Sequence, residues 1–326
     1  MRKYLAHPLL PEIITLGIIV TGALCFPLLS SGLHYAPPFL FSSLRVFIAG
    51  IGILLILPLL GQPILPPKDT WKWVMLFSIA AVVFGYGVMF LSHAGNSSML
   101  VPVLENLQPF LTIMLATAFL HEKLSSATRT VLAFGTFGIF FMSAGMFTSS
   151  GDFNFQGGML AFLAALSASG ASILAKRIKR PDVILTITAW QFIVGSIPLF
   201  ILSRIFETSV STEFNISFLA ILFFLAIIGT AATSAVWYVL VQTVDVSRLS
   251  VFFFLSPAFG LLLANRLYAV PIGFFEWIGI TTIIVGVIFG FKKQSARESE
   301  SLPINKASSI NNFSFYERGT RGRNPK

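Results

Sequence analysis

Two side chains of opposite charge, Arg45 and Glu105, lie inside long apolar stretches of the sequence. A charge within membrane hydrocarbon costs at least ~2.5–3.5 kcal/mol on insertion scales, so such residues usually face protein or water and often have a function. Each lies roughly 10–12 Å deep at the rise of an α-helix. We expect a pair, or the two poles of a site for an amphipathic solute, with Arg45 facing a carboxylate. The structural alternative is that Arg45 extends to the lipid headgroups and Glu105 only neutralises it.

A polar stripe surrounds Glu105. Residues Glu105, Gln108, Pro109 and Thr112 have the spacing of one helix face. Gln108 is therefore predicted to line the same site, and Glu105 is the candidate proton-coupling carboxylate. Pro109 lacks an N–H and can kink its helix, as can Pro257 in a later segment. We expect these two prolines to act in gating; packing alone is the alternative.

Aromatic and amide side chains inside other apolar segments complete the candidates for substrate binding. Each combines an apolar body with one polar handle. They are Tyr86, Trp190, Gln191, Trp237 and Tyr238. Thr230 carries less weight, because a threonine hydroxyl can bond to its own helix.

The sequence lacks the spacings of known catalytic and metal-binding motifs. Its four histidines lie near segment ends without an HExxH pattern, and it contains neither a GxSxG sequence nor a Walker loop. The single cysteine, Cys25, can form no intrachain disulfide and no CxxC site. We therefore predict no catalytic residue, no metal, no cofactor and no enzymatic activity.

The composition is typical of a polytopic membrane protein. Hydrophobic types make up 55% of the 326 residues and charged types 11%, whereas soluble chains carry about 25% charged residues. This balance excludes a soluble enzyme, a nucleic-acid-binding domain and a disordered chain. A bilayer core is about 30 Å thick, and ten apolar segments are long enough to span it. They are residues 12–31, 37–60, 71–92, 98–120, 129–147, 157–175, 183–204, 216–240, 247–266 and 271–291.

Lysine and arginine in the connections favour one orientation. With the N-terminus inside and the tail left out, the inner side holds 11 of these residues and the outer side only Arg204 and Arg266. We expect a multi-pass protein of the plasma (inner) membrane with both termini in the cytoplasm, including the N-terminal residues 1–11. Residues 292–326 are polar and without hydrophobic periodicity, which predicts a disordered basic cytoplasmic tail.

The two halves of the sequence resemble each other. A shift of 148 residues aligns Leu107 with Leu255 and Pro109 with Pro257. The match predicts two five-helix repeats, 12–147 and 157–291.

Five is an odd number, so the second repeat must enter the membrane from the opposite side. Inverted repeats around a central cavity are a common build of secondary transporters. The counterparts of Arg45 and Glu105 are then Gln191 and Phe253. Two bundles that are similar for packing alone are the alternative.

Four stretches resemble the EamA-type proteins of the drug/metabolite transporter superfamily. One of them, with its glycine steps, is similar to the tenth span: WIGITTIIVGVIFG (277–290). NLQPFLTIMLATAFLHEKLS (106–125), with Pro109 and Glu122, is similar to the fourth span of that family and the loop after it. SLRVFIAGIGILLIL (43–57) and FFFLSPAFGLLLANRL (252–267) resemble its second and ninth spans. The second repeat departs from the pattern, because Asn265 and Arg266 stand where an acidic residue is expected.

The resemblance implies ten helices with cytoplasmic ends, a central cavity and carrier-type movement of small metabolites, often export. We predict a secondary, non-ATP carrier that exports amino acids or related amphipathic solutes by alternating access. An exchanger, such as a nucleotide-sugar-like carrier of an internal membrane, and a non-transporting membrane protein remain open. The expected partners are a small-molecule solute and the lipid bilayer, without nucleic acid; a homodimer is left open.

Overall fold

Helices account for all regular structure in the described part of the chain, which in this computed structural model comprises residues 10–94, 100–148, 154–208, 212–268 and 271–301. Nine helical segments there are long and apolar enough to cross a membrane, and Phe274–Gly290 is a shorter apolar helix. The prediction of an all-α membrane protein with ten transmembrane helices is confirmed.

The first five spans form the first repeat. They are α1 (Leu10–Gly32); α2 (Pro38–Ile56) with η2 (Leu57–Leu60); η3 (Lys68–Thr70), α3 (Trp71–Phe77), η4 (Ser78–Gly87) and α4 (Val88–Ala94); α5 (Leu100–Glu105) and α6 (Gln108–Leu120); and α7 (Ser126–Thr148).

The next five spans form the second repeat. They are α8 (Phe155–Ile178); α9 (Ile184–Phe206); α10 (Ile216–Ala226), η5 (Ile227–Ala232) and α11 (Thr233–Thr243); α12 (Val246–Ser250), η6 (Val251–Phe254) and α13 (Leu255–Tyr268); and α14 (Phe274–Ser301).

The helix α14 is longer than its apolar segment. It continues to Ser301, so residues 292–301 are helical and not disordered as predicted. This stretch contains lysine, glutamine, arginine and glutamate, which are good helix formers and extend a helix that is already nucleated. The rest of the predicted tail, 302–326, and residues 1–9 of the predicted cytoplasmic N-terminus lie outside the described residues.

The two repeats interrupt their helices at corresponding positions. The third and eighth spans contain π-helical segments, η4 and η5, and residues 79–84 fall on 227–232 with the 148-residue shift. The fourth span breaks between α5 and α6, and the ninth changes to the 3₁₀ segment η6. The break in the fourth span has a local cause, because Pro109 cannot donate to the carbonyl of Glu105 and its ring crowds that carbonyl.

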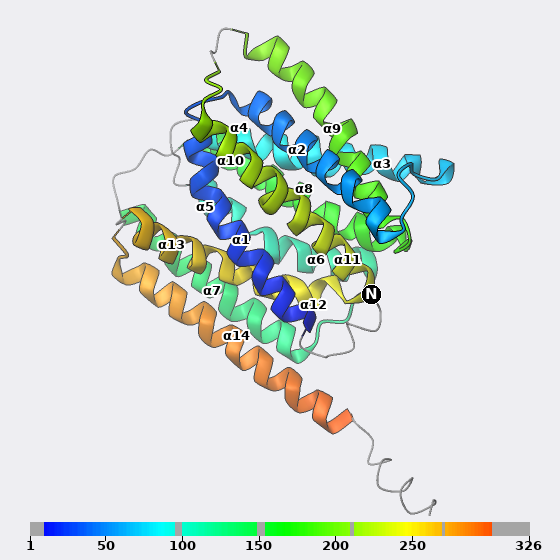
Figure 1. The fold of residues 1–326 in the computed structure, drawn as a ribbon. Helices are drawn as coiled ribbons and strands as arrows, with labels where there is room; N and C mark the ends of the chain where they lie inside the picture. Colours follow the sequence, from blue (N-terminus) through cyan, green and yellow to red (C-terminus); the bar gives the residue numbers. More distant parts are fainter. Residues whose placement is uncertain (1–9, 95–99, 149–153, 209–211, 269–270, 302–326) are drawn as a thin grey trace, which may run out of the picture.

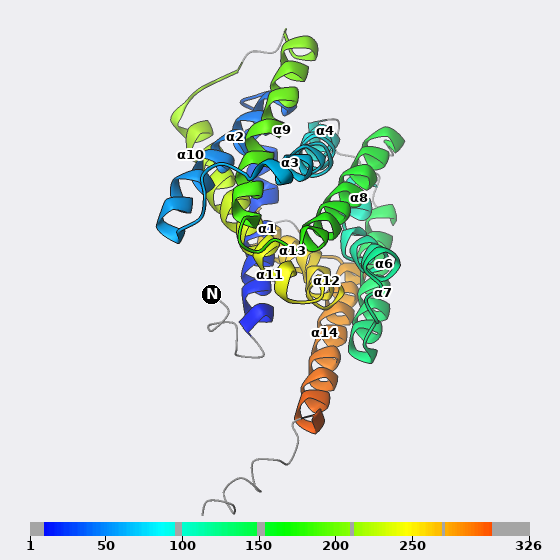
Figure 2. The same cartoon turned by 90° about the vertical axis from the view of Figure 1, so that its right-hand side faces the viewer.

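Corresponding spans of the two repeats also pack against each other. α2 lies beside α9, and α7 lies beside α14, at opposite sides of the bundle (Figures 1 and 2). Glycine permits the close approach of α7 and α14: a Cβ at Gly279 would stand 2.6 Å from the carbonyl oxygen of Gly138. Small residues at such crossings are the usual means by which membrane helices pack.

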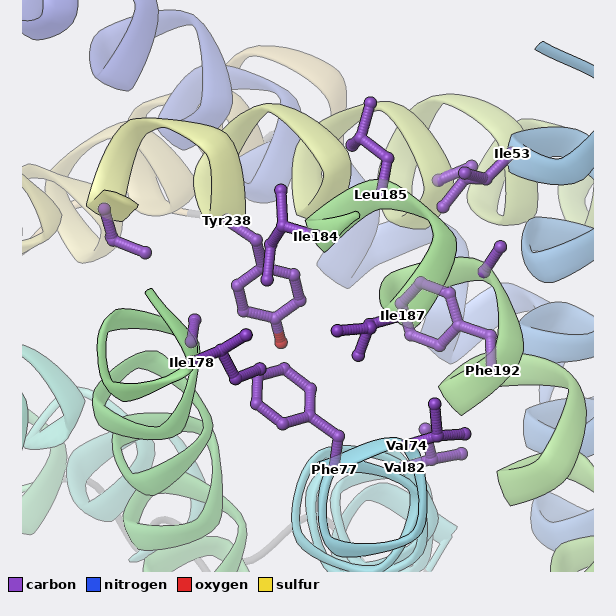
Figure 3. Close-up of a cluster of buried hydrophobic side chains, with 14 of the residues drawn as sticks. Ile53, Val74, Phe77, Val82, Ile178, Ile184, Leu185, Ile187, Phe192 and Tyr238 are labelled. Atoms are coloured by element: carbon purple, nitrogen blue, oxygen red, sulfur yellow. The ribbon is translucent and has the colours of Figure 1, made fainter. Parts of the chain in front are cut away.

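A large apolar cluster fixes α9 against the first repeat. Figure 3 shows Tyr238 of α11 and Phe77 of α3 meeting Ile187 and Phe192 of α9. The rings of Phe77 and Tyr238 meet edge to face, with 5.3 Å between their centroids. A second cluster joins α7, α13 and α14 with α1. The space between the two clusters is where a polar cavity can form.

We expect Gly279→Ala to lower the melting temperature of the detergent-solubilised protein, because the added methyl group would overlap Gly138 and Met142 of α7. Overpacking of this kind costs about 1–3 kcal/mol. The matched control is Gly170→Ala in α8, where an added Cβ has no neighbour within 4 Å. Equal melting temperatures for the two variants would contradict the close packing of α7 on α14.

Candidate substrate-binding site

A cavity of about 280 Å³ lies between the repeats and is lined by seven of the ten spans. Its apolar wall is made largely of small residues of α8, such as Ala165 and Ala168. Its polar and aromatic lining comes from both repeats. That lining includes Arg45, Tyr86, Glu105, Asn106, Gln108, Thr112, Ser172, Thr233, Ser234, Trp237, Tyr238, Phe253 and Ser256.

The guanidinium of Arg45 is held by a hydroxyl and two aromatic rings. Its Nε donates to Oγ1 of Thr230 at 2.7 Å, and its Cζ lies 5.4 and 5.6 Å from the ring centroids of Tyr86 and Phe90. Only 4% of the residue is exposed. No carboxylate of the described residues is within ion-pair distance of it, and the charge therefore remains available to a ligand.

Glu105 faces a histidine instead of Arg45. Its Oε1 lies 3.6 Å from Nδ1 of His93, which is 2.9 Å from the carbonyl oxygen of Met89. Both side chains are largely buried, with 13% and 16% of their surface exposed. The predicted pair of Arg45 and Glu105 is thus not formed, and the two charges line the same cavity as separate groups.

The stripe on the fourth span points into the cavity as predicted. Gln108, Pro109 and Thr112 all contribute to its lining. Oγ1 of Thr112 donates to Oγ of Ser169 at 2.9 Å, which ties the stripe to α8. Pro257 begins the corresponding helix α13 but is not among the lining residues.

The aromatic candidates divide into two groups. Tyr86, Trp237 and Tyr238 line the cavity, and Nε1 of Trp237 donates to Oγ of Ser172 at 3.0 Å. Phe253, the counterpart of Glu105, meets Trp237 edge to face with 5.0 Å between the centroids. One wall of the cavity is therefore aromatic.

Trp190 and Gln191 do not line the cavity. Nε1 of Trp190 donates to the carbonyl oxygen of Ile64 at 2.8 Å, in the connection after the second span. Gln191 is fully buried on α9, and its backbone carbonyl oxygen accepts a hydrogen bond from the hydroxyl of Ser78. The physical reason is that α9 packs along α2 and α3, so these residues face neighbouring helices and not the space between the repeats.

The end of the bundle at which α1 begins is closed by polar contacts. The buried Glu12 of α1 forms an ion pair with Arg248 of α12, at 2.6 Å between Oε1 and Nη2. Nζ of Lys176 donates to the carbonyl oxygen of Val244 at 2.8 Å. In the exposed connection before α9, hydrogen bonds from Arg180 lower the pKa of Asp182. Of these contacts, the ion pair of Glu12 and Arg248 joins the two repeats.

Two glutamates act as caps between the repeats. The carboxylate of Glu122, the acidic residue after the fourth span, accepts from the amides of Val246 and Ser247 at 3.0 and 2.8 Å. Glu207 at the end of α9 accepts in the same way from Phe39 and Leu40 of α2, at 2.7 and 3.0 Å. Each carboxylate satisfies free amides at a helix N-terminus, where its charge is also favourable.

Two five-helix repeats that enclose a polar cavity within a membrane bundle define the class of multi-pass carrier proteins. The sequence model of the EamA-like transporter family matches residues 10–144 and 155–291. The chain belongs to this family of membrane transporters, and the resemblance to EamA-type proteins is confirmed.

Individual relatives agree with this assignment. The chain is similar to two Bacillus subtilis (strain 168) proteins described as uncharacterized transporters. YoaV is 26% identical over 266 residues, which cover 79% of this chain and 85% of YoaV. YvbV is 24% identical over 291 residues, which cover 89% of this chain and 94% of YvbV. These descriptions indicate a membrane transporter and not an enzyme.

A solved structure shows the same fold. One crystal structure superposes with a TM-score of 0.73 and covers 89% of this chain and 99% of its own. Its sequence is 20% identical, so the likeness concerns the fold alone.

We expect Glu122→Ala and Glu207→Ala each to lower the melting temperature, because each leaves two helix-terminal amides without their acceptor. Loss of a cap costs about 0.5–2 kcal/mol. The matched control is Glu213→Ala, whose exposed side chain contributes no cap. A control as destabilised as the two cap variants would contradict the assigned role.

Proposed function

We propose that this transporter is a secondary carrier that exports small amphipathic solutes with a carboxylate, amino acids among them, by alternating access. The observation that carries the proposal is the buried guanidinium of Arg45, which lines the cavity without a carboxylate partner among the described residues. Leaving a charge without a counter-ion in hydrocarbon is costly. A carboxylate ligand would supply that counter-ion during transport.

The groups around Glu105 support a zwitterionic solute. Glu105 and His93 lie 3.6 Å apart, and the carboxylate lines the cavity that Arg45 also lines. In place of a proton, the Glu105 carboxylate can bind an ammonium group of the solute. Glu105 thereby becomes the residue at which a proton and the solute compete, which is a route to coupling.

The paired helix interruptions support alternating access. The breaks before Pro109 and Pro257 occur at corresponding positions of the two repeats, in spans that reach the cavity. Interrupted helices at the repeat interface are the usual moving parts of carriers with inverted repeats. The polar contacts at the end where α1 begins would then form the closed gate of this state, with Glu12 and Arg248 as its ion pair.

We expect proteoliposomes to show saturable counterflow of at least one zwitterionic amino acid. Arg45→Gln and Glu105→Gln should each lower the initial rate at least about tenfold, because each removes a charged hydrogen-bond partner of the solute. The matched controls are Arg204→Gln and Glu213→Gln, which change exposed residues of the same types. Unchanged counterflow in the Arg45 variant, or none of any solute in the wild type, would overturn the proposal.

The proposed site of action is the plasma membrane, with both termini in the cytoplasm. We expect green fluorescent protein fused to the C-terminus to fluoresce in bacterial cells, and alkaline phosphatase fused there to be inactive. Phosphatase fused after the first span, near Tyr35, should be active. An active phosphatase at the C-terminus would contradict this orientation without affecting the assignment of the cavity.

A further inference from the structure

The hydroxyl of Thr230 has both of its hydrogen-bonding roles fixed. Oγ1 accepts from Nε of Arg45 at 2.7 Å and donates to the carbonyl oxygen of Leu225 at 2.9 Å. The residue is fully buried, so no water competes for these positions. Thr230 therefore sets the direction in which the Nε edge of the guanidinium points.

The π-helical segment η5 brings Thr230 into this position. Its hydroxyl reaches back five residues to Leu225, whereas Thr233, just beyond the segment, reaches back the usual four to Gly229. In an ordinary α-helix a threonine hydroxyl bonds three or four residues back. The wider helical turn at η5 therefore orients the hydroxyl of Thr230 so that it can accept a hydrogen bond from the second span.

The corresponding π-helical segment of the first repeat, η4, contacts the same Arg45 side chain. Tyr86 lies in η4, its ring faces the guanidinium of Arg45, and its hydroxyl is 3.3 Å from Oγ of Ser234. Arg45 is therefore fixed between two π-helical segments at corresponding positions of the two repeats.

With Nε occupied, the Nη1 and Nη2 edge of Arg45 is left for a ligand. These nitrogens make no hydrogen bond to the described residues. Space beside this edge depends on Gly229, because a Cβ there would lie 3.6 Å from Nη2 and 2.5 Å from Sγ of Cys25. Two parallel donors beside an open space match the two oxygens of a planar carboxylate.

We propose that Thr230 is a positioning residue that presents the Nη edge of Arg45 to the carboxylate of the transported solute in a two-point contact. This inference rests on the proposed function, because it assumes that Arg45 meets a carboxylate. It adds that the affinity for a carboxylate depends on a hydroxyl that does not touch the solute.

The test uses radiolabelled benzoate as a planar carboxylate probe and unlabelled benzamide as its neutral counterpart, in a scintillation proximity assay on the purified full chain. We expect Thr230→Val, which keeps the shape and removes the hydroxyl, to raise the dissociation constant for benzoate about tenfold. Thr230→Ser keeps the hydroxyl and should stay within about twofold of wild type. Benzamide at equal concentration should compete weakly in all three proteins.

A double-variant comparison distinguishes a positioning role of Thr230 from a general disturbance of the binding site. Lysine has no Nε edge for Thr230 to hold, so Thr230→Val should have no further effect on benzoate binding in an Arg45→Lys background. Should Thr230→Val fail to elute as a monodisperse protein, Thr230→Ala takes its place with the same expectation.

The outcomes distinguish the two proposals. If wild type binds benzoate and Thr230→Val binds it equally well, or Thr230→Ser is as weak as Thr230→Val, the positioning role is overturned and the carboxylate site stands. A further loss in the Arg45→Lys background overturns it as well. If wild type binds no benzoate at millimolar concentration, the carboxylate site itself fails, and with it the proposed function.

Discussion

Within hydrocarbon every backbone N–H and C=O must find a partner in the protein, and this constraint decides where the helices of this chain can be interrupted. The interruptions in the third, fourth, eighth and ninth spans all lie next to residues that line the cavity or contact the opposite repeat. In contrast, α7 and α14 run without a break beside each other. The π-helical turn at η5 also directs the hydroxyl of Thr230 towards Arg45.

The charged residues of the bundle are subject to the same need for partners within the protein. Glu12 forms an ion pair with Arg248, and Glu122 and Glu207 accept hydrogen bonds from helix amides, whereas Oε1 of Glu105 has no hydrogen-bond partner among the described residues. Arg45 differs from these residues, since its partners among the described residues are a hydroxyl and aromatic faces. Aromatic faces stabilise a guanidinium without neutralising it. The proposed ligand site rests on this charge, which is buried and oriented but not neutralised.

The sequence predicts the span count and the depth of the charges, because both follow from apolar length and helix rise. It also places Gln108 on the helix face of Glu105, and both line the cavity; the gating role of Pro109 stays a prediction. It could not place Trp190 and Gln191, since a helix that is apolar on all sides does not indicate which face meets a neighbour. The sequence did not indicate His93 as the neighbour of Glu105. It gave Thr230 little weight, because Arg45 is 185 residues away and only the π-helical turn directs the hydroxyl to it.

The contact between Tyr86 and Ser234 joins a residue to its own counterpart, 148 positions along the chain. A contact between two counterpart residues is expected at the pseudo-twofold axis that relates inverted repeats. When two inverted repeats exchange conformations, a contact between two non-equivalent residues is replaced by the contact between their counterparts. A contact between two residues that are counterparts of each other is left unchanged. Under the proposed alternating access, Tyr86 and Ser234 can therefore stay together while the cavity opens to either face in turn.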